Sequence, residues 1–238
     1  MEEAFAISIK DTDIYQREQL VLSQVNFQLI NGEFVFLIGK VGSGKSSLIK
    51  TLNAELPVFN GEANVAGYSL QTIKTKDIPF LRRKIGVVFQ DFKLLTDRSI
   101  YKNLHFVLKS TGWTDEKAMN ERIDSILEEV GMVAFKQKMP HQRSGGEQQR
   151  IVIARALLNN PEIILADEPT GNLDFDTSVG ILELFKKINS EGKTVLMATH
   201  DKLVVDKYPA RTLICSEGKL IDAGMSQGEQ LDFRSFID

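Results

Sequence analysis

The sequence predicts a mixed α/β fold in which a parallel sheet is linked by crossover helices and an antiparallel sheet precedes it. Apolar and polar residues alternate over residues 4–36, with a turn signal at Asn31-Gly32, which indicates antiparallel strands. Continuous apolar runs at Phe34–Ile38, Ile163–Ala166 and Thr194–Thr199 are typical of strands buried on both faces. Because helical spacing separates these runs, we expect a parallel sheet.

Composition excludes several classes of protein. The 238 residues are 42% hydrophobic and 26% charged, which fits one or two globular domains with a sizeable core. The net charge is -3 and no basic stripe is present, so we expect no nucleic-acid partner. No apolar run reaches the roughly 18 residues of a membrane span, so we expect membrane association only through a partner. Cys215 lies in an apolar stretch and is expected to be a buried, inert thiol.

Three helical segments follow from hydrophobic spacing. The first begins near Ser47, and its apolar face is expected to continue through Leu56 until Pro57 stops it. The polar middle section, residues 92–150, favours helix, and Gly131 ends an apolar stripe within it. The third helix is expected over residues 177–189, between two of the buried strands.

The first chemical motif is the run Gly39-Lys40-Val41-Gly42-Ser43-Gly44-Lys45-Ser46, which lies between a predicted strand and a predicted helix. Its glycines allow the backbone to approach a polyphosphate closely and to turn successive N–H groups toward it. Lys45 is expected to reach the β and γ phosphates, and the Ser46 hydroxyl to ligate Mg²⁺. A glycine-rich turn with an incidental lysine is the alternative, which the strand-to-helix context makes the weaker interpretation.

The second motif is Asp167-Glu168, which ends a buried strand at the edge where an open α/β sheet holds its active site. We expect Asp167 to hold the metal ion, directly or through water, and Glu168 to act as the general base toward the attacking water. A solvated acidic turn before Pro169 is the alternative reading of the same residues.

The third motif, Ser144-Gly145-Gly146-Glu147-Gln148-Gln149-Arg150, opens a helix with a second phosphate-sized anion site. With this motif, nearly all of the chain resembles the ABC ATPase family. The resemblance implies a P-loop NTPase with a RecA-like core, an antiparallel β subdomain and an α-helical signature subdomain. It implies a single domain over residues 1–238, with 92–150 as the helical subdomain and 1–91 and 151–238 as the core with its β subdomain.

The same resemblance suggests roles for isolated residues. Tyr15 is similar to the aromatic that stacks on adenine, Gln90 to the glutamine that senses Mg²⁺ and the partner, Asp174 to the D-loop aspartate, and His200 to the histidine at the γ phosphate. Considered alone, three of these residues have structural alternatives: Tyr15 as a strand aromatic, Gln90 as a strand-end cap and His200 as a packed histidine. The candidate ATP-binding residues are Tyr15, Gly39, Gly42, Ser43, Gly44, Lys45, Ser46, Ser47, Gln90, Ser144, Gly145, Gly146 and Glu147. The candidate metal ligands are Ser46, Gln90 and Asp167, and the candidate catalytic residues are Lys45, Glu168, Asp174 and His200.

The family pattern further implies ATP hydrolysis by a head-to-tail homodimer that forms on ATP binding, in which Ser144-Gly145-Gly146 of one copy covers the nucleotide of the other. It also implies an integral membrane partner, which would hold this chain peripherally at the cytoplasmic face of a bacterial inner membrane. Two positions depart from the pattern. Arg143 stands where leucine is usual, and Val41 where serine is usual; neither change removes a phosphate donor.

Residues 89–103 are similar to the same segment in the FtsE branch of the family, the cell-division ATPases that pair with the membrane protein FtsX. The LolD and MacB branches, which serve lipoprotein release and macrolide export, share the string from Glu168 to Asp174 and are the alternative. A Rad50-type repair ATPase would need a long coiled coil between Lys45 and Ser144, and no heptad run is present there. A regulatory scaffold would be expected to lack Glu168 or His200.

Overall fold

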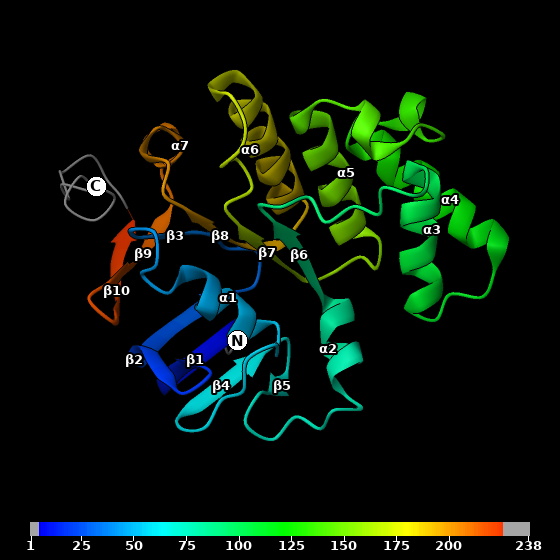
Figure 1. Ribbon diagram of the computed structural model, residues 1–238. Helices are drawn as coiled ribbons and strands as arrows, with labels where there is room; N and C mark the ends of the chain where they lie inside the picture. Colours follow the sequence, from blue (N-terminus) through cyan, green and yellow to red (C-terminus); the bar gives the residue numbers. More distant parts are fainter. Residues whose placement is uncertain (1–4, 226–238) are drawn as a thin grey trace.

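The computed structural model describes residues 5–225, with the side chains of residues 202–204 and 225 left out (Figure 1). It contains two sheets. The antiparallel sheet has the order β2-β1-β4-β5 and the larger sheet the order β10-β9-β3-β8-β7-β6. The antiparallel strands are β1 (Phe5–Gln16), β2 (Gln19–Ile30), β4 (Glu62–Val65) and β5 (Tyr68–Ser69). The strands of the larger sheet are β3 (Phe34–Ile38), β6 (Ile85–Phe89), β7 (Ile163–Asp167), β8 (Thr194–Thr199), β9 (Arg211–Ser216) and β10 (Lys219–Met225).

The apolar runs form the parallel strands that the sequence predicts. Strands β6, β7, β8, β3 and β9 are parallel, and β10 returns antiparallel to β9. Because side chains alternate along a strand, β3 supplies Phe36 and Ile38 to one core and Val35 and Leu37 to the other. All four side chains are fully buried, which explains why the run is continuously apolar.

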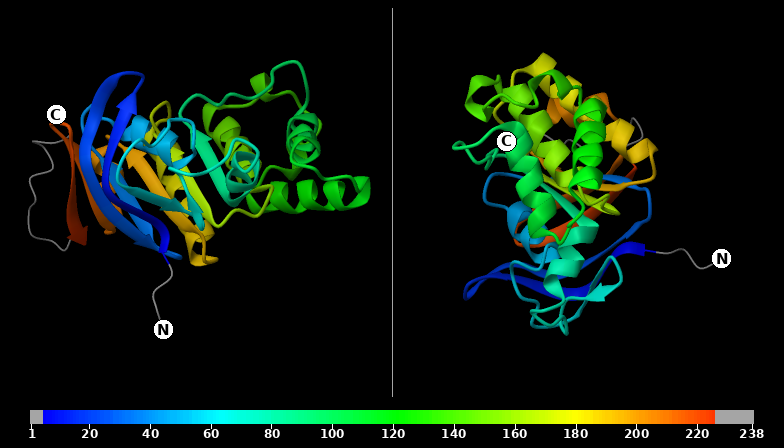
Figure 2. Two further views of the ribbon diagram at one scale, coloured as in Figure 1. Left: turned by 90° about the horizontal axis from the view of Figure 1, so that it is seen from below. Right: turned by 90° about the vertical axis from the view of Figure 1, so that its right-hand side faces the viewer.

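Helices cover both faces of the larger sheet (Figures 1 and 2). Helix α1 (Lys45–Leu52) contacts β1 and β7 and so lies between the two sheets. On the opposite face lie α5 (Gly145–Leu157) and α6 (Phe175–Ser190). Beyond the β6 edge are α3 (Ile100–Ser110) and α4 (Glu116–Glu129), and two short turns, η1 (Val133–Phe135) and η2 (Pro140–Gln142), lead into α5. The remaining helices are α2 (Ile78–Lys84) and α7 (Lys202–Lys207).

Most predicted elements match the structure, but the first helix is shorter than expected. It ends at Leu52 and does not reach Leu56, because Ala54 takes a left-handed conformation (φ = +52°) and the amides of Glu55 and Leu56 both donate to Lys50 O. The apolar stripe before Gly131 is confirmed, since Ile123, Ile126, Leu127 and Val130 are fully buried. The helix α4 ends just before Gly131, which has φ = +73°. The boundary placed after residue 150 falls inside α5, which continues to Leu157.

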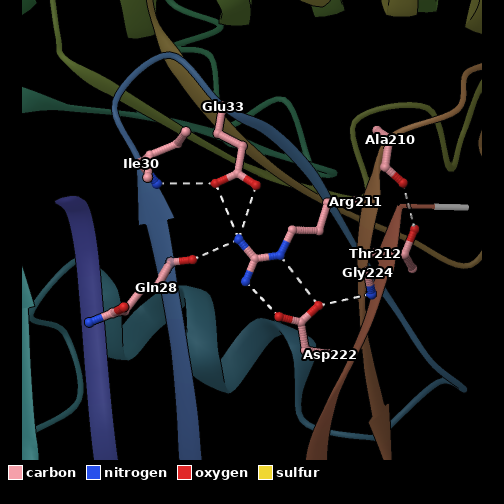
Figure 3. A network of polar contacts seen from close by, with 8 residues as sticks. All are labelled: Gln28, Ile30, Glu33, Ala210, Arg211, Thr212, Asp222 and Gly224. Atoms are coloured by element: carbon pink, nitrogen blue, oxygen red, sulfur yellow. Dashed lines mark hydrogen bonds and ion pairs between the residues drawn. The ribbon is translucent and has the colours of Figure 1, made fainter. Parts of the chain in front are cut away.

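Arg211, the first residue of β9, joins the two sheets (Figure 3). Its Nη1 donates to Gln28 O at 2.8 Å and to Glu33 Oε1 at 3.0 Å, and its Nη2 donates to Asp222 Oδ2 at 2.6 Å. Glu33 Oε2 also accepts from the amide of Ile30 at 3.0 Å. One guanidinium therefore fixes the end of β2, the turn before β3 and the edge strand β10 relative to one another.

Candidate active site

The loop between β3 and α1 has a backbone that only glycine accommodates at two positions. Gly39, with φ = +151°, would place a Cβ 2.4 Å from the carbonyl oxygen of Cys215, and Gly44, with φ = +108°, would place one 2.9 Å from Val21. Cys215 is buried, as expected, and burial raises the pKa of its thiol to about 12. The buried Ser43 Oγ has no hydrogen-bond partner among the described residues, so a polar acceptor or donor fits inside this loop.

Lys45 begins α1 and is almost completely buried, with only 4% of its side chain exposed. Its Nζ donates to the carbonyl oxygens of Gly39 at 2.7 Å and Lys40 at 3.2 Å. The same Nζ lies 3.3 Å from Glu168 Oε1. The loop therefore holds its own lysine at its centre, facing the carboxylate at the end of β7.

Asp167 is the last residue of β7, and its Oδ1 accepts a hydrogen bond from Ser46 Oγ at 3.1 Å. Burial raises the pKa of Asp167, and the hydrogen bond from Ser46 opposes that rise. A hydroxyl and a carboxylate oxygen beside a phosphate-sized loop are the donor set that Mg²⁺ takes when substrate phosphates complete its coordination. The residues present therefore fit the metal. No group of three or more His, Cys, Asp or Glu side chains within residues 5–225 forms a separate metal cluster.

Glu168 follows β7 directly in a left-handed conformation, φ = +51°, which a residue other than glycine adopts only when its surroundings hold it there. Its amide donates to Ala198 O at 2.9 Å, which anchors it to the end of β8. Its two carboxylate oxygens face different partners, Lys45 on one side and His200 Nδ1 on the other. Three of the four predicted catalytic residues are thus brought together.

A cleft of about 580 Å³ runs from these residues to the tip of the β1–β2 hairpin. Gln90 lines it from the end of β6 and donates from Nε2 to Asn172 Oδ1 at 3.4 Å. The cleft is also lined by four residues at the tip of the hairpin, none of which belongs to a sequence motif: Gln16, Gln19, Leu20 and Val21. The lining residues are Gln16, Gln19, Leu20, Val21, Val41, Gly42, Gly44, Lys45, Ser46, Ser47, Gln90, Glu168 and His200.

Other predicted site residues do not line this cleft. Tyr15 is turned toward Phe59, with its ring edge-on at 5.8 Å between centroids. Ser144 caps α5, where its Oγ accepts from the Glu147 amide at 3.3 Å and the Glu147 carboxylate accepts from the Ser144 amide at 2.9 Å. Asp174 caps α6, where it accepts from the amide and hydroxyl of Thr177 at 3.0 and 2.6 Å. The hydrogen bonds from Thr177 lower the pKa of Asp174.

The starts of α5 and α6 approach each other closely at Gly146. A Cβ on Gly146 would lie 2.3 Å from Thr177 Cγ2, so the glycine lets the two helix ends approach. Gly145 packs beside Leu173 in the same way, with a contact of 3.2 Å expected for a Cβ there. Ser144, Gly145, Gly146 and Asp174 therefore form a second group, separate from the cleft that holds Lys45. Arg143 lies over the Phe135 ring at 4.5 Å and beside Glu147, at 3.9 Å.

Comparison with known proteins assigns this arrangement to a family. The family model described as ABC transporter matches residues 22–171, which include the phosphate loop, the Ser144–Glu147 capping box and the Asp167-Glu168 pair. The chain belongs to the ABC transporter family. It is an ABC ATPase that binds ATP, with the α/β fold of ATP-binding cassettes.

Relatives of known name cover most of the chain. The cell division ATP-binding protein FtsE of Streptococcus pneumoniae serotype 2 is 41% identical over 87% of this chain and 90% of its own length. FtsE of Mycobacterium tuberculosis is 44% identical over 84% of this chain and 86% of its own length. Among solved structures, the dimeric post-hydrolysis state of the ATP-binding cassette MJ0796, bound to ADP and Pi, has a TM-score of 0.79 and is 33% identical. It covers 91% of this ABC ATPase and 98% of its own chain.

Helix length and composition bear on membrane crossing. Of the helices within residues 5–225, none combines the length and apolar character that a membrane span requires.

Proposed function

We propose that this chain is the ATP-hydrolysing subunit of a bacterial complex of the FtsE–FtsX kind. In it, ATP hydrolysis would drive the membrane protein to activate cell-wall hydrolases during division. The observation that carries the enzymatic part is that Lys45, Ser46, Glu168 and His200 line one cleft, with Asp167 hydrogen-bonded to Ser46 beside it. The FtsE relatives, at 41–44% identity, support the cell-division part.

The chemistry follows from the positions of these side chains. A water oxygen attacks the γ phosphorus of ATP, the bond to the β–γ bridging oxygen breaks, and Glu168 accepts the proton of the water. Phosphate oxygens that reach Lys45 compete with Glu168 for its Nζ, which leaves the carboxylate available to the water. His200, whose Nδ1 contacts the second oxygen of Glu168, would donate to the γ phosphate.

Ser46, Asp167 and Gln90 would hold Mg²⁺. When bound, the ion supplies positive charge to the β and γ phosphates. Ser46 and Asp167 are already in hydrogen-bond contact, and Gln90 lines the same cleft as Ser46. The raised pKa of Asp167 follows from its burial, and a nearby cation would favour its ionised form.

The chain works as a homodimer in this proposal. The Ser144–Glu147 turn and Asp174 lie outside the cleft of their own chain, as expected if they act on the nucleotide of a second copy. The related cassette MJ0796 is a dimer bound to ADP and Pi, and supports the same assembly here. A two-fold axis would give two equal sites, each with Lys45 from one copy and Ser144 from the other. Tyr15 would stack on adenine after leaving Phe59.

A pull-down tests the narrower part of the proposal. The Glu168→Gln chain, tagged and supplied with ATP, would be recovered from mild-detergent extracts of its own cells and analysed by mass spectrometry. We expect an FtsX-type protein, which would place the complex at the cytoplasmic face of the inner membrane. Recovery of a lipoprotein-releasing or exporter permease would overturn the cell-division role and leave the ATPase mechanism standing.

A further inference from the structure

Arg143 stands directly before the Ser144–Glu147 turn, at the position where the family pattern has leucine. Its guanidinium lies over the Phe135 ring, 4.5 Å from the centroid, and 20% of its side chain is exposed. The side-chain amide of Gln148 donates to the Arg143 carbonyl oxygen at 3.0 Å, so the backbone is fixed as well. Arg143 is therefore held against the protein, with its charge beside the start of α5.

The carboxylate of Glu147 lies next to that charge. Its Oε1 is 3.9 Å from Arg143 Nη1, and its Oε2 accepts from the Ser144 amide at 2.9 Å. At 3.9 Å the two charged groups attract each other without a direct hydrogen bond. Arg143 thus offsets the negative charge of Glu147, while Glu147 remains free to cap the helix.

A second carboxylate lies near the same turn. Asp174 accepts hydrogen bonds from Thr177, and Thr177 meets Gly146 where the starts of α5 and α6 approach each other. Among the ion pairs of the described residues, the pair with Arg143 is the one that involves either Glu147 or Asp174. In the proposed dimer these two carboxylates approach a polyanion, the nucleotide of a second copy, and like charges oppose that approach.

We propose that Arg143 promotes closure of the ATP-bound dimer by offsetting the charge of Glu147 at the turn that covers the nucleotide of a second copy. It is a positioning residue that acts through Glu147, because its guanidinium stays stacked on Phe135. This inference rests on the proposed homodimer. It adds a residue that sets how readily the dimer forms. Nucleotide binding to a single copy should not depend on Arg143, which does not line the cleft that holds Lys45.

The test measures ATP-driven dimerisation of the full chain in the Glu168→Gln background, where the ATP-bound dimer should accumulate. Light scattering as a function of protein concentration gives the dimer dissociation constant. Arg143→Leu should raise this constant about 4- to 20-fold, the range expected when two partly exposed ion pairs are lost from each dimer. The difference should shrink at high salt, which screens the carboxylate of Glu147. The affinity for ADP should stay unchanged, which also checks folding.

A second substitution separates charge from packing. Glu147→Gln removes the negative charge but keeps an oxygen that can accept from the Ser144 amide, as glutamine does in capping boxes. Combined with Arg143→Leu in one chain, it should return the dimer dissociation constant to within about twofold of the Glu168→Gln background. Arg143→Lys keeps the positive charge and should retain most of the dimer affinity. The control is Lys138→Leu, which removes an exposed cation from the same connecting segment and should change nothing.

Two outcomes would overturn this role of Arg143 and leave the ATP-bound dimer standing. One is a double variant that dimerises as poorly as Arg143→Leu, since the arginine would then act by packing or by touching the nucleotide itself. The other is an Arg143→Leu chain that dimerises as well as its Glu168→Gln background. If that background, with its native Arg143, forms no dimer with ATP, the proposed homodimer fails and the role of Arg143 fails with it.

Discussion

Glu168 Oε1 lies 3.3 Å from Lys45 Nζ, so the proposed general base and the proposed phosphate-binding lysine are ion-paired across the cleft. The pair joins two segments 123 positions apart in the numbering, the loop after β3 and the end of β7. It ties binding of the phosphates to release of the base, because both depend on the same ammonium group.

Glu168→Gln should lower the rate of ATP hydrolysis by about 10²–10⁴-fold, since the amide cannot accept the proton of the attacking water. ATP binding should persist, and the ATP-bound dimer should accumulate. Phosphate release and light scattering with ATP measure the two effects. Glu162→Gln, at an exposed carboxylate paired with Lys84, is the matched control. Wild-type turnover by Glu168→Gln would remove this residue from the mechanism.

Lys45→Ala should weaken ATP affinity by about 10–100-fold, the range expected for one charge-assisted hydrogen bond to phosphate. Isothermal titration with ATP measures this directly. Lys50→Ala, in the last turn of the same helix, should bind ATP as the wild type does. Unchanged affinity in Lys45→Ala would contradict the assignment of the phosphate loop.

Mixing two inactive variants should restore activity if the site is shared. Ser144→Ala removes the cap of α5 and should cost about 1 kcal/mol of stability while impairing hydrolysis in the homodimer. Combined with Lys45→Ala, it should give heterodimers in which one of the two sites has an intact Lys45 facing an intact Ser144. The measurement compares the ATP hydrolysis rate of the mixture with the rate of each variant alone. A mixture no faster than either variant would indicate that Ser144 acts on its own chain.

Gly146→Ala should destabilise the fold by about 1–3 kcal/mol, because the added methyl overlaps Thr177 Cγ2. To escape, Thr177 must rotate and lose its hydroxyl bond to Asp174. Thr177→Ser removes Cγ2 and keeps the hydroxyl, so the double variant should recover most of the lost stability. The urea unfolding midpoints of wild type, the two single variants and the double variant measure this recovery. If the two substitutions change stability additively, the contact between residue 146 and Thr177 Cγ2 is not the cause of the loss.

Asp167→Asn should raise stability at neutral pH while reducing metal-dependent hydrolysis. Burial raises the pKa of Asp167, so the folded state favours the protonated carboxyl. Its contribution to stability is present below the unfolded pKa and is lost as pH rises through the folded pKa. The melting temperature of the variant should therefore exceed that of wild type more at pH 7 than at pH 4. A constant difference across this range would contradict the assignment.

The sequence predicts the local parts of this molecule better than the long-range ones. The strands Phe34–Ile38 and Thr194–Thr199 appear with the predicted bounds, because burial on both faces leaves a continuous apolar run. The helix expected to reach Leu56 ends at Leu52, since the turn at Ala54 depends on backbone bonds that side-chain periodicity does not encode.

The candidate site follows the same division. Motif spacing was enough to predict Lys45 and Glu168 as site residues, because each lies in a short motif that directly follows a recognisable apolar strand. It could not predict the Arg211 network or the packing of Tyr15 on Phe59, since each joins residues far apart in the sequence. The hairpin residues Gln16 and Leu20 carry no motif, and only the fold brings them to the cleft.

The position of β3 between β8 and β9 also sets an order of events during synthesis. A ribosome releases β3 early, yet both of its sheet neighbours and the Cys215 carbonyl that backs Gly39 come from the last third of the chain. The phosphate loop therefore cannot take its final shape on a nascent chain that stops before β9. We therefore expect ATP binding to begin only late in synthesis, after β9 has joined β3.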